Sequence, residues 1–417
     1  MGAIEKITSE EILDCRGIPT LKTTVVLSDG TSGTAFVPGG TSAGSNEAHE
    51  LRDGDPTRFE GRGVLKAVEN VNGPIQSRLK GVDSDNQKKI DETLISLDGT
   101  PDKSKLGENA ILSVSLAASV ATAANQKLQL FEYLRKLTKI SGRFTIPTPM
   151  VNLIEGGKHA DNELDFQEFL VIPSGFSNFK EKLDAVNKVV SQLNISLKSN
   201  GIDGALGQEG GFAAGFPSNE KAVAFLKGVL KANSDSRYFS ISIDAAASNF
   251  YQDGSYRIID IQYPLKSEQL VDFYKKLQDT YGLFSIEDPL DETDLNGWKA
   301  AKEKLPAQTL LIGDDLTTTN VVTLRKVLET DLIDGVVVKP NQIGTLSETM
   351  DFVSIAKEKN LKIIVSHRAG ETMDTFISDL AVAVSADYLK AGSPLQKERA
   401  VKYNRLVEIE NYLKAKQ

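Results

Sequence analysis

The sequence predicts an α/β protein in which a β/α barrel follows a smaller α+β domain. Three observations lead to this expectation. The chain has 417 residues, which is enough for a barrel with one additional domain. Its first third begins with strand patterns and continues with helical patterns, as in an α+β domain. From about residue 148 onwards, short apolar runs alternate with amphipathic helices, as in parallel sheets and barrels.

The N-terminal region is expected to form an antiparallel meander followed by helices. The expected strands span 4–12, 20–27 and 34–37, with a turn at 28–30. The expected helices span 63–79, 84–97 and 108–137. The stretch 138–149 then contains one glycine and two prolines, which interrupt regular structure. We therefore expect an N-terminal domain at 1–137 and a barrel domain at 138–417.

The C-terminal region is expected to supply the β/α units. Its clearest strand patterns span 239–243, 283–286, 309–312, 335–338, 362–365 and 386–389. Amphipathic helices are expected between them at 267–280, 320–329, 347–359 and 374–384, and a hairpin at 250–264. Many such units in one domain favour a closed barrel over an open sheet. Neither a Gly-x-Gly-x-x-Gly motif nor a P-loop follows a strand, which argues against a nucleotide-binding fold.

Composition and charge exclude several classes of protein. The chain carries 48 Lys and Arg against 57 Asp and Glu, a net charge of −9, and has no local basic patch, so nucleic acid is not an expected partner. Its single cysteine, Cys15, excludes an internal disulfide and fits a reducing compartment. No apolar stretch reaches the about 20 residues needed to span a bilayer. The expected location is the cytoplasm.

The strongest functional signal is a set of polar residues at the ends of the apolar runs. The six runs lead into Asp244, Glu287, Asp314, Lys339, Ser366-His367-Arg368 and Lys390. A single carboxylate after a strand is about as often a helix N-cap as a functional group. A single lysine at such a position is usually a surface residue. Polar residues at six successive strand ends favour the functional interpretation over these alternatives. A parallel barrel gathers the carboxyl ends of its strands at one rim, so these side chains are expected to share one cleft.

The chemistry of this set points to a metal and a base. Asp244, Glu287 and Asp314 would repel one another unless a cation neutralised them. They offer hard oxygen ligands and no cysteine lies near, so Mg²⁺ fits best and Mn²⁺ is an alternative. Apolar surroundings and a nearby metal would disfavour the ammonium of Lys339, which would then suit a general base. Such a pair suits removal of a proton α to a carboxylate.

Two glycine-rich segments carry further candidates. The segment 156–162 contains His159 and leads to Gln167 and Glu168, and the segment 207–212 places Glu209 among glycines. Glycines let the backbone approach a ligand closely. The alternatives are a structural, hydrogen-bonded histidine in the first segment and a flexible turn in the second. A third small-residue loop, at 39–44, is either a lid that closes over substrate or a connector.

Several short motifs are distributed along the whole chain, and their combination is more informative than any single one. They lie at 14–20, 47–55, 63–68, 167–169, 209–212, 285–289, 313–316, 341–345, 366–368 and 402–404. In combination they resemble the enolase family nearly end to end. The resemblance implies an enolase-type β/α barrel whose second strand runs antiparallel, with an N-terminal α+β lid domain. It also implies reversible, Mg²⁺-dependent dehydration of 2-phosphoglycerate to phosphoenolpyruvate in glycolysis and gluconeogenesis, and a homodimer or an octamer of dimers.

The resemblance also implies roles for the metal and for the proton transfers. Two Mg²⁺ ions would bind in each site, the first to Asp244, Glu287 and Asp314 and the second to Ser42 in the closing loop. Lys339 would remove the C2 proton, and Lys390 would help to stabilise the resulting enediolate.

The remaining implied roles concern the leaving group and substrate binding. Glu209, assisted by Glu168, would protonate the C3 hydroxyl as it leaves. Arg368 would bind the phosphate. The other implied pocket residues are His159, His367, Gln167 and Ser366.

The chain departs from the enolase pattern at several positions near these residues. They are Gly39, Ala43, Glu155, Gln208, Pro340 and Ala369, the last replacing a serine whose hydroxyl usually touches the phosphate. Two alternatives therefore stay open: an enolase-fold enzyme that acts on another acid, and a non-catalytic structural or surface-binding protein with a location at or outside the cell surface. The presence of Lys339, Glu209 and Glu168 favours catalysis.

Overall fold

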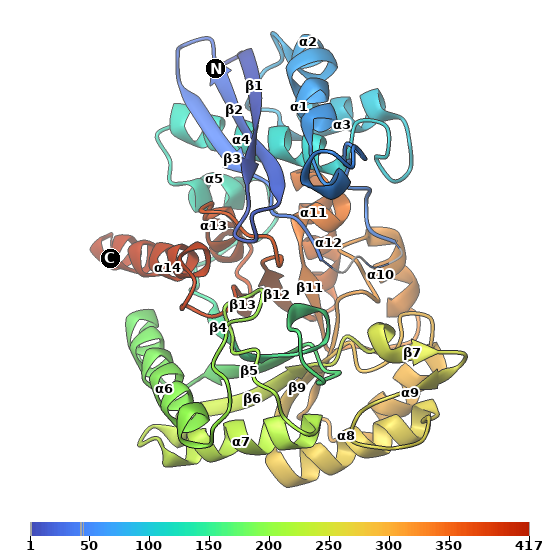
Figure 1. Cartoon of the computed structure of the whole chain (residues 1–417). Coiled ribbons are helices and arrows are strands. Elements are labelled where there is room, and N and C mark those ends of the chain that lie inside the picture. Colours follow the sequence, from blue (N-terminus) through green and yellow to red (C-terminus); the bar gives the residue numbers. More distant parts are fainter. Residues whose placement is uncertain (1, 42–43, 45, 417) are drawn as a thin grey trace.

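A computed structural model describes residues 2–41, 44 and 46–416. Figure 1 shows the N-terminal strands and helices, coloured blue to cyan, beside a barrel that is formed by the rest of the chain. The predicted combination of an α/β barrel with a preceding α+β unit is confirmed.

The N-terminal strands form the predicted antiparallel meander. They are β1 (Ile4–Leu13), β2 (Pro19–Leu27) and β3 (Ser32–Phe36), paired in the order β1-β2-β3. Buried and less buried residues alternate along β2 and β3, because successive side chains of a strand point to opposite faces. The sheet packs against α4 (Glu108–Asn125), a helix that is buried almost throughout.

Gly33 of β3 marks a very close approach between this sheet and α4. A Cβ atom at Gly33 would lie 2.1 Å from the Ala121 nitrogen and 2.7 Å from the Ala117 oxygen, both in the backbone of α4. We expect Gly33→Ala to lower the free energy of unfolding by about 1–3 kcal/mol, the usual cost of overpacking. Urea unfolding measures this loss. Gly215→Ala is the matched control, since no heavy atom lies within 4 Å of its added Cβ, and an equal loss in both variants would contradict the steric explanation.

One predicted helix is interrupted by a proline. The expected helix at 63–79 consists of α1 (Leu65–Asn70), a π-helical turn (Val71–Ile75) and α2 (Gln76–Leu79). Pro74 lies inside the turn. Its ring nitrogen carries no hydrogen, so a regular helical hydrogen bond is lost there.

A second predicted helix is divided by a turn. The expected helix at 108–137 consists of α4 and α5 (Leu130–Lys136). Lys127, between them, has a φ of 55°, which lies in the left-handed region and ends the right-handed helix. The third expected helix is present as α3 (Gln87–Asp98), which begins where the Asn86 side chain accepts a hydrogen bond from the Lys89 amide.

Within the described residues, eight strands close into a barrel. In order around the barrel they are β4 (Thr148–Glu155), β5 (Glu168–Pro173), β6 (Phe239–Asp244), β9 (Leu283–Glu287), β10 (Leu310–Gly313), β11 (Gly335–Val338), β12 (Lys362–Ser366) and β13 (Tyr388–Lys390). β5 pairs antiparallel with both of its neighbours, and all other neighbours pair parallel. The second strand therefore runs antiparallel, as the resemblance implied, and its first residue lies at the rim where the other strands end.

Helices surround the barrel, as Figure 1 shows. They are α6 (Phe179–Ser199), α7 (Asn219–Ala232), α8 (Ser267–Tyr281), α9 (Leu295–Lys304), α10 (Val321–Leu328), α11 (Pro340–Ile343), α12 (Leu346–Glu358), α13 (Phe376–Ala383) and α14 (Lys397–Ala415). The expected hairpin is formed by β7 (Tyr251–Gln252) and β8 (Ser255–Tyr256). None of the helices that the structure describes is long and apolar enough to cross a membrane.

The barrel interior is packed with apolar side chains. A cluster contributed by several strands fills it, consisting of Met150, Leu170, Ile172, Ile312, Val337 and Ile364. A filled interior is typical of eight-stranded barrels, whose ligands bind at the rim. The polar residues at the strand ends are therefore the part of the barrel that is placed to meet a ligand.

The N-terminal region contacts the barrel beside this rim. Gly39 and Gly370 exchange backbone hydrogen bonds of 3.0 and 2.8 Å. Asp91 of α3 accepts hydrogen bonds from the backbone and hydroxyl of Ser347, at 2.8 and 2.6 Å. The first contact holds the segment before residue 42 near the end of β12, and the second joins α3 to α12 (Leu346–Glu358).

Candidate active site

Strand register brings the predicted rim residues together. Asp244, at the end of β6, pairs with Glu287 of β9 on one side and with Glu168 of β5 on the other. Ser366 of β12 pairs with Lys390 of β13. The other predicted residues directly follow the ends of their strands: Asp314, Lys339, His367 and Arg368. Six strand ends and the start of β5 thus contribute to one site.

Lys390 lies among three carboxylates. It is 1% exposed, and its Nζ lies 2.8 Å from Glu287 Oε1, 3.1 Å from Glu168 Oε2 and 3.5 Å from Asp244 Oδ2. Burial alone would lower the pKa of Lys390, but the three carboxylates raise it well above its usual value. Lys390 is therefore a permanent positive charge in the rim.

Lys339 forms an ion pair with Asp314. Its Nζ donates to Asp314 Oδ2, while Gln342 Nε2 donates to Asp314 Oδ1 at 2.9 Å. Burial disfavours the ammonium of Lys339, yet the Asp314 carboxylate raises the pKa of Lys339 above its usual value. The prediction from sequence was based on the apolar strand before Lys339 and on a nearby metal, both of which disfavour the ammonium. The contact with the Asp314 carboxylate acts in the opposite direction.

The three predicted metal ligands lie at the same rim, with two ammonium groups among them. Lys390 contacts Asp244 and Glu287, and Lys339 contacts Asp314. Burial and the nearby Asp244 carboxylate raise the pKa of Glu287 to about 8. Burial would also raise the pKa of Asp314, but Lys339 lowers it. The predicted repulsion between neighbouring carboxylates is thus present at Glu287.

Asp314 also belongs to a compact acidic group whose other members were not predicted as metal ligands from the sequence. One oxygen each of Asp288, Asp314 and Asp315 lies within 4.8 Å of the others. Asp288 accepts hydrogen bonds from the backbone amides of Asp314 and Asp315, at 3.0 and 2.7 Å. Asp288 therefore fixes the backbone that carries Asp314.

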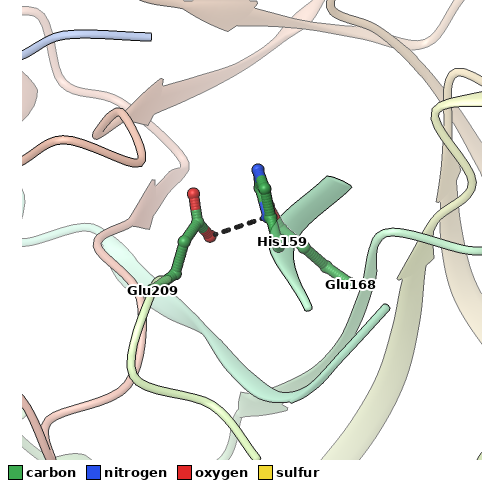
Figure 2. A group of neighbouring side chains, drawn as sticks. All are labelled: His159, Glu168 and Glu209. Atoms are coloured by element: carbon green, nitrogen blue, oxygen red, sulfur yellow. Dashed lines mark ion pairs between the residues drawn. The ribbon is translucent and has the colours of Figure 1, made fainter. Parts of the chain in front are cut away.

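His159, Glu168 and Glu209 form a second compact group, with their polar atoms within 4.8 Å of one another (Figure 2). His159 Nδ1, in a short helical turn (Gly157–His159), lies 3.6 Å from Glu209 Oε2 and 3.8 Å from Glu168 Oε1. Burial raises the pKa of Glu168 well above its usual value. Burial acts on Glu209 in the same direction, but His159 and His367 bring the pKa of Glu209 well below its usual value. The pKa values of these two neighbouring carboxyl groups therefore shift in opposite directions.

Arg399 of α14 sets the protonation of His367, a role that the sequence analysis missed. Arg399 Nη1 lies 2.5 Å from His367 Nδ1. A guanidinium can only donate, so Nδ1 accepts and the ring proton is on Nε2. That nitrogen lies 3.2 Å from Glu209 Oε2. Burial lowers the pKa of His367 to about 4, so the ring is neutral at pH 7 and donates to Glu209.

A weak signal for Arg399 exists in the sequence. Arg399, Lys402 and Leu406 recur at helical spacing, so they share one face of α14. All three are buried. Two basic residues on the apolar face of a helix indicate specific buried partners, because basic side chains are almost never fully buried unless they are paired.

Arg368 connects the rim to the N-terminal region. Its guanidinium donates to Glu47 Oε2 and to Asn341 Oδ1, each at 3.0 Å. Gln167 Nε2 lies 3.5 Å from Asp244 Oδ2, and the Ser366 hydroxyl donates to the His367 carbonyl at 3.0 Å. These contacts place Arg368, Gln167 and Ser366 at the rim. Ser42, the predicted ligand of a second metal, lies outside the described residues.

Known protein families match the chain along almost its whole length. A family model described as "Enolase, N-terminal domain" matches residues 4–134, and one described as "Enolase, C-terminal TIM barrel domain" matches residues 143–417. The chain belongs to the enolase family. It is similar to a protein named enolase from a Nitratiruptor species, with 45% identity over 415 residues, which is 99% of this chain and 97% of that relative.

Membership in the enolase family gives the site its chemical class. Enolases are phosphopyruvate hydratases, carbon–oxygen lyases that dehydrate 2-phosphoglycerate and use a divalent metal. The residues present fit such a metal. Carboxylate oxygens are the ligands that hard divalent cations prefer, and burial together with the nearby Asp244 carboxylate disfavours the ionised form of Glu287. In the described part of the chain, the buried atoms His159 Nδ1 and Asn152 Oδ1 have no hydrogen-bond partner, so polar groups remain for a ligand.

Proposed function

We propose that this enolase-family enzyme converts 2-phosphoglycerate reversibly to phosphoenolpyruvate and water, with two Mg²⁺ ions per site, in glycolysis and gluconeogenesis. The main support is that one rim carries both the amine of Lys339 and a buried carboxyl pair, Glu168 and Glu209. Loss of the C2 proton requires a base and loss of the C3 hydroxyl requires an acid. The rim offers both.

The metal would be held by carboxylates of this rim. Asp244, Glu287 and Asp314 are the proposed ligands of the first ion, and Ser42, outside the described residues, is the proposed ligand of the second. When bound, the ions supply positive charge that neutralises these carboxylates and stabilises the negative charge that builds up on the substrate.

The first chemical step is proposed to take place at C2. Lys339 Nζ accepts the C2 proton, and the electron pair of the broken C–H bond moves into the substrate carboxylate, giving an enediolate. Asp314 is the charge that keeps Lys339 protonated, and a cation bound to Asp314 would offset that charge and make the amine available as a base. Lys390, already placed among carboxylates, supplies a fixed positive charge for the enediolate.

The second step is proposed to take place at C3. The enediolate electrons form the C2–C3 double bond while the C3–O bond breaks, and the hydroxyl leaves as water with a proton from Glu209. Glu168, whose raised pKa favours its protonated form, supplies the proton that Glu209 passes to the leaving hydroxyl, with His159 beside both. His367 holds the Glu209 carboxyl through its Nε2–H.

The substrate phosphate is proposed to bind Arg368. A phosphate would replace Glu47 as the partner of the guanidinium, because both present oxygens to a planar, bidentate donor. Gln167 and Ser366 line the pocket beside it.

The formation of phosphoenolpyruvate tests the proposed function. Its enol absorbs in the ultraviolet, so absorbance is followed after addition of 2-phosphoglycerate, with and without Mg²⁺. A folded protein that binds Mg²⁺ but shows no turnover would refute the proposal. Turnover of a different hydroxy acid instead would support an enolase-fold enzyme with another substrate.

Removal of one proposed ligand charge should weaken metal binding. Asp244→Asn keeps the shape of the side chain but removes its charge, and we expect the Mg²⁺ concentration for half-maximal activity to rise about 10- to 100-fold. Activity is measured over a Mg²⁺ titration. Asp279→Asn is the control, since Asp279 is 56% exposed on α8 and pairs with Lys275. An unchanged titration for Asp244→Asn would remove Asp244 from the metal site.

Domain organisation, assembly and location are proposed from the sequence. We place the N-terminal lid domain at 1–137 and the barrel domain at 138–417, with a homodimer or an octamer of dimers in the cytoplasm. Light scattering on the purified protein measures the number of subunits.

A further inference from the structure

Glu155, the last residue of β4, is a buried acid that the proposed reaction does not use. Its exposed fraction is 0%. Its side chain accepts a hydrogen bond from the Gly211 amide at 2.5 Å, and the Glu209 amide lies 3.2 and 3.1 Å from its two oxygens. These are backbone amides of the loop 207–212, which carries the proposed acid Glu209.

The loop is also joined to β4 through the backbone. The Phe212 amide donates to the Leu153 carbonyl at 2.9 Å, and the Glu155 amide donates to the Phe212 carbonyl at 3.0 Å. This pairing fixes the end of the loop at Phe212. The Glu155 side chain extends the attachment to the amides of Glu209 and Gly211.

Glycines in the loop allow it to lie directly on the Glu155 side chain. A Cβ atom at Gly207 would lie 2.2 Å from Glu155 Oε2, and one at Gly211 would lie 3.0 Å from Glu155 Oε1. Any larger residue at Gly207 would therefore push the loop away. The backbone at Gly207 and Gly211 thus packs directly against the Glu155 carboxyl group.

The side chain of Glu209 is held separately from its backbone. Its Oε2 is 3.2 Å from His367 Nε2 and 3.3 Å from Asn152 Nδ2. The carboxyl group can meet these partners only if the backbone of Glu209 is correctly placed. We infer that Glu155 is a positioning residue for the dehydration step, because its oxygens hold the backbone amides of the loop that presents Glu209.

This inference rests on the proposed function, in which Glu209 acts at C3. Displacement of Glu209 should therefore impair the loss of water and leave removal of the C2 proton by Lys339 intact. The two steps are measured separately, as formation of phosphoenolpyruvate and as exchange of the C2 proton with deuterated solvent.

Glu155→Met removes both acceptor oxygens at nearly constant side-chain length. We expect kcat for dehydration to fall about 10- to 100-fold, as for small displacements of catalytic groups, with KM and C2 exchange close to wild type. Burial and the Glu209 carboxylate raise the pKa of Glu155 to about 8, so its neutral form is present at pH 7. Glu155→Gln, which is also neutral and keeps one acceptor oxygen, should recover most of the loss.

The controls separate positioning from a general loss of structure. Glu163→Met changes an exposed acid between β4 and β5 and should leave both rates unchanged. Melting temperatures are recorded for all variants. Glu155→Ala, which avoids any clash of the methionine methyl group with Gly207, is a second variant without the acceptors and replaces Glu155→Met if that protein does not fold.

Two results would overturn the inference. One is wild-type dehydration by the variants without acceptors, and the other is an equal loss of dehydration and C2 exchange in them. Glu209→Gln is measured in parallel. If the unchanged protein does not dehydrate 2-phosphoglycerate, the proposed function fails. If it does but Glu209→Gln dehydrates equally well, Glu209 is not the acid and the inference falls with that role. If Glu209→Gln blocks dehydration while Glu155→Met does not, the role of Glu155 alone is wrong.

Discussion

Replacement of Lys339 by methionine is expected to abolish exchange of the substrate C2 proton with solvent and to lower kcat by about 10³- to 10⁴-fold, at the upper end for loss of a general base. The methionine keeps most of the side-chain volume but cannot accept a proton. In the proposed mechanism Lys339 is the group that accepts the C2 proton, so both the exchange and the overall reaction stop with it.

The exchange is measured by mass spectrometry of 2-phosphoglycerate after incubation in deuterated water. Lys299→Met is the control, because Lys299 lies on α9 with 69% of its side chain exposed and pairs only weakly with Glu303 at 4.0 Å. Persistent exchange in folded Lys339→Met would show that another group removes the proton.

Glu209→Gln is expected to separate the two halves of the reaction. We expect phosphoenolpyruvate formation to fall about 10²- to 10⁴-fold, the range for loss of a general acid, while C2 exchange continues. The amide has the same shape as the carboxyl group and still lies near His367 Nε2, but it cannot transfer a proton to the C3 hydroxyl. The enediolate can then only return to substrate, and each return can exchange the proton.

Exchange and product formation are followed in the same sample, so that the ratio of the two rates is independent of enzyme concentration. Glu303→Gln serves as the matched control because its side chain is 67% exposed on α9. A parallel fall of both rates in Glu209→Gln would place Glu209 in the first step as well, contrary to the proposed division of roles.

The rim could be predicted because its signal is local. Asp244, Glu287, Asp314, Lys339 and Lys390 each follow or end a short apolar run, and parallel strands bring their carboxyl ends to one side of a barrel. Only strand pattern and order were needed for this prediction, and the structure has these residues at one rim.

The start of the barrel was harder to predict. β4 and β5 were not among the expected strands, because β5 follows β4 without an intervening helix and runs antiparallel. A search for alternating strands and helices therefore finds the barrel only from β6 onwards. Glu168 and His159 were candidates because of a glycine-rich segment and received their roles only through the family resemblance. The antiparallel direction of β5 is what brings Glu168 to the rim.

The sequence by itself determined the fold class, the family and the set of polar residues at the rim, because these depend on patterns and motifs along the chain. Only the tertiary structure decided the proton on His367 through Arg399, the pairing of Lys339 with Asp314, and the attachment of the Glu209 loop to Glu155. Each of these depends on contacts between residues far apart in sequence. Hydrogen bonds and pKa values change within fractions of an ångström, and no local pattern encodes distances of that kind.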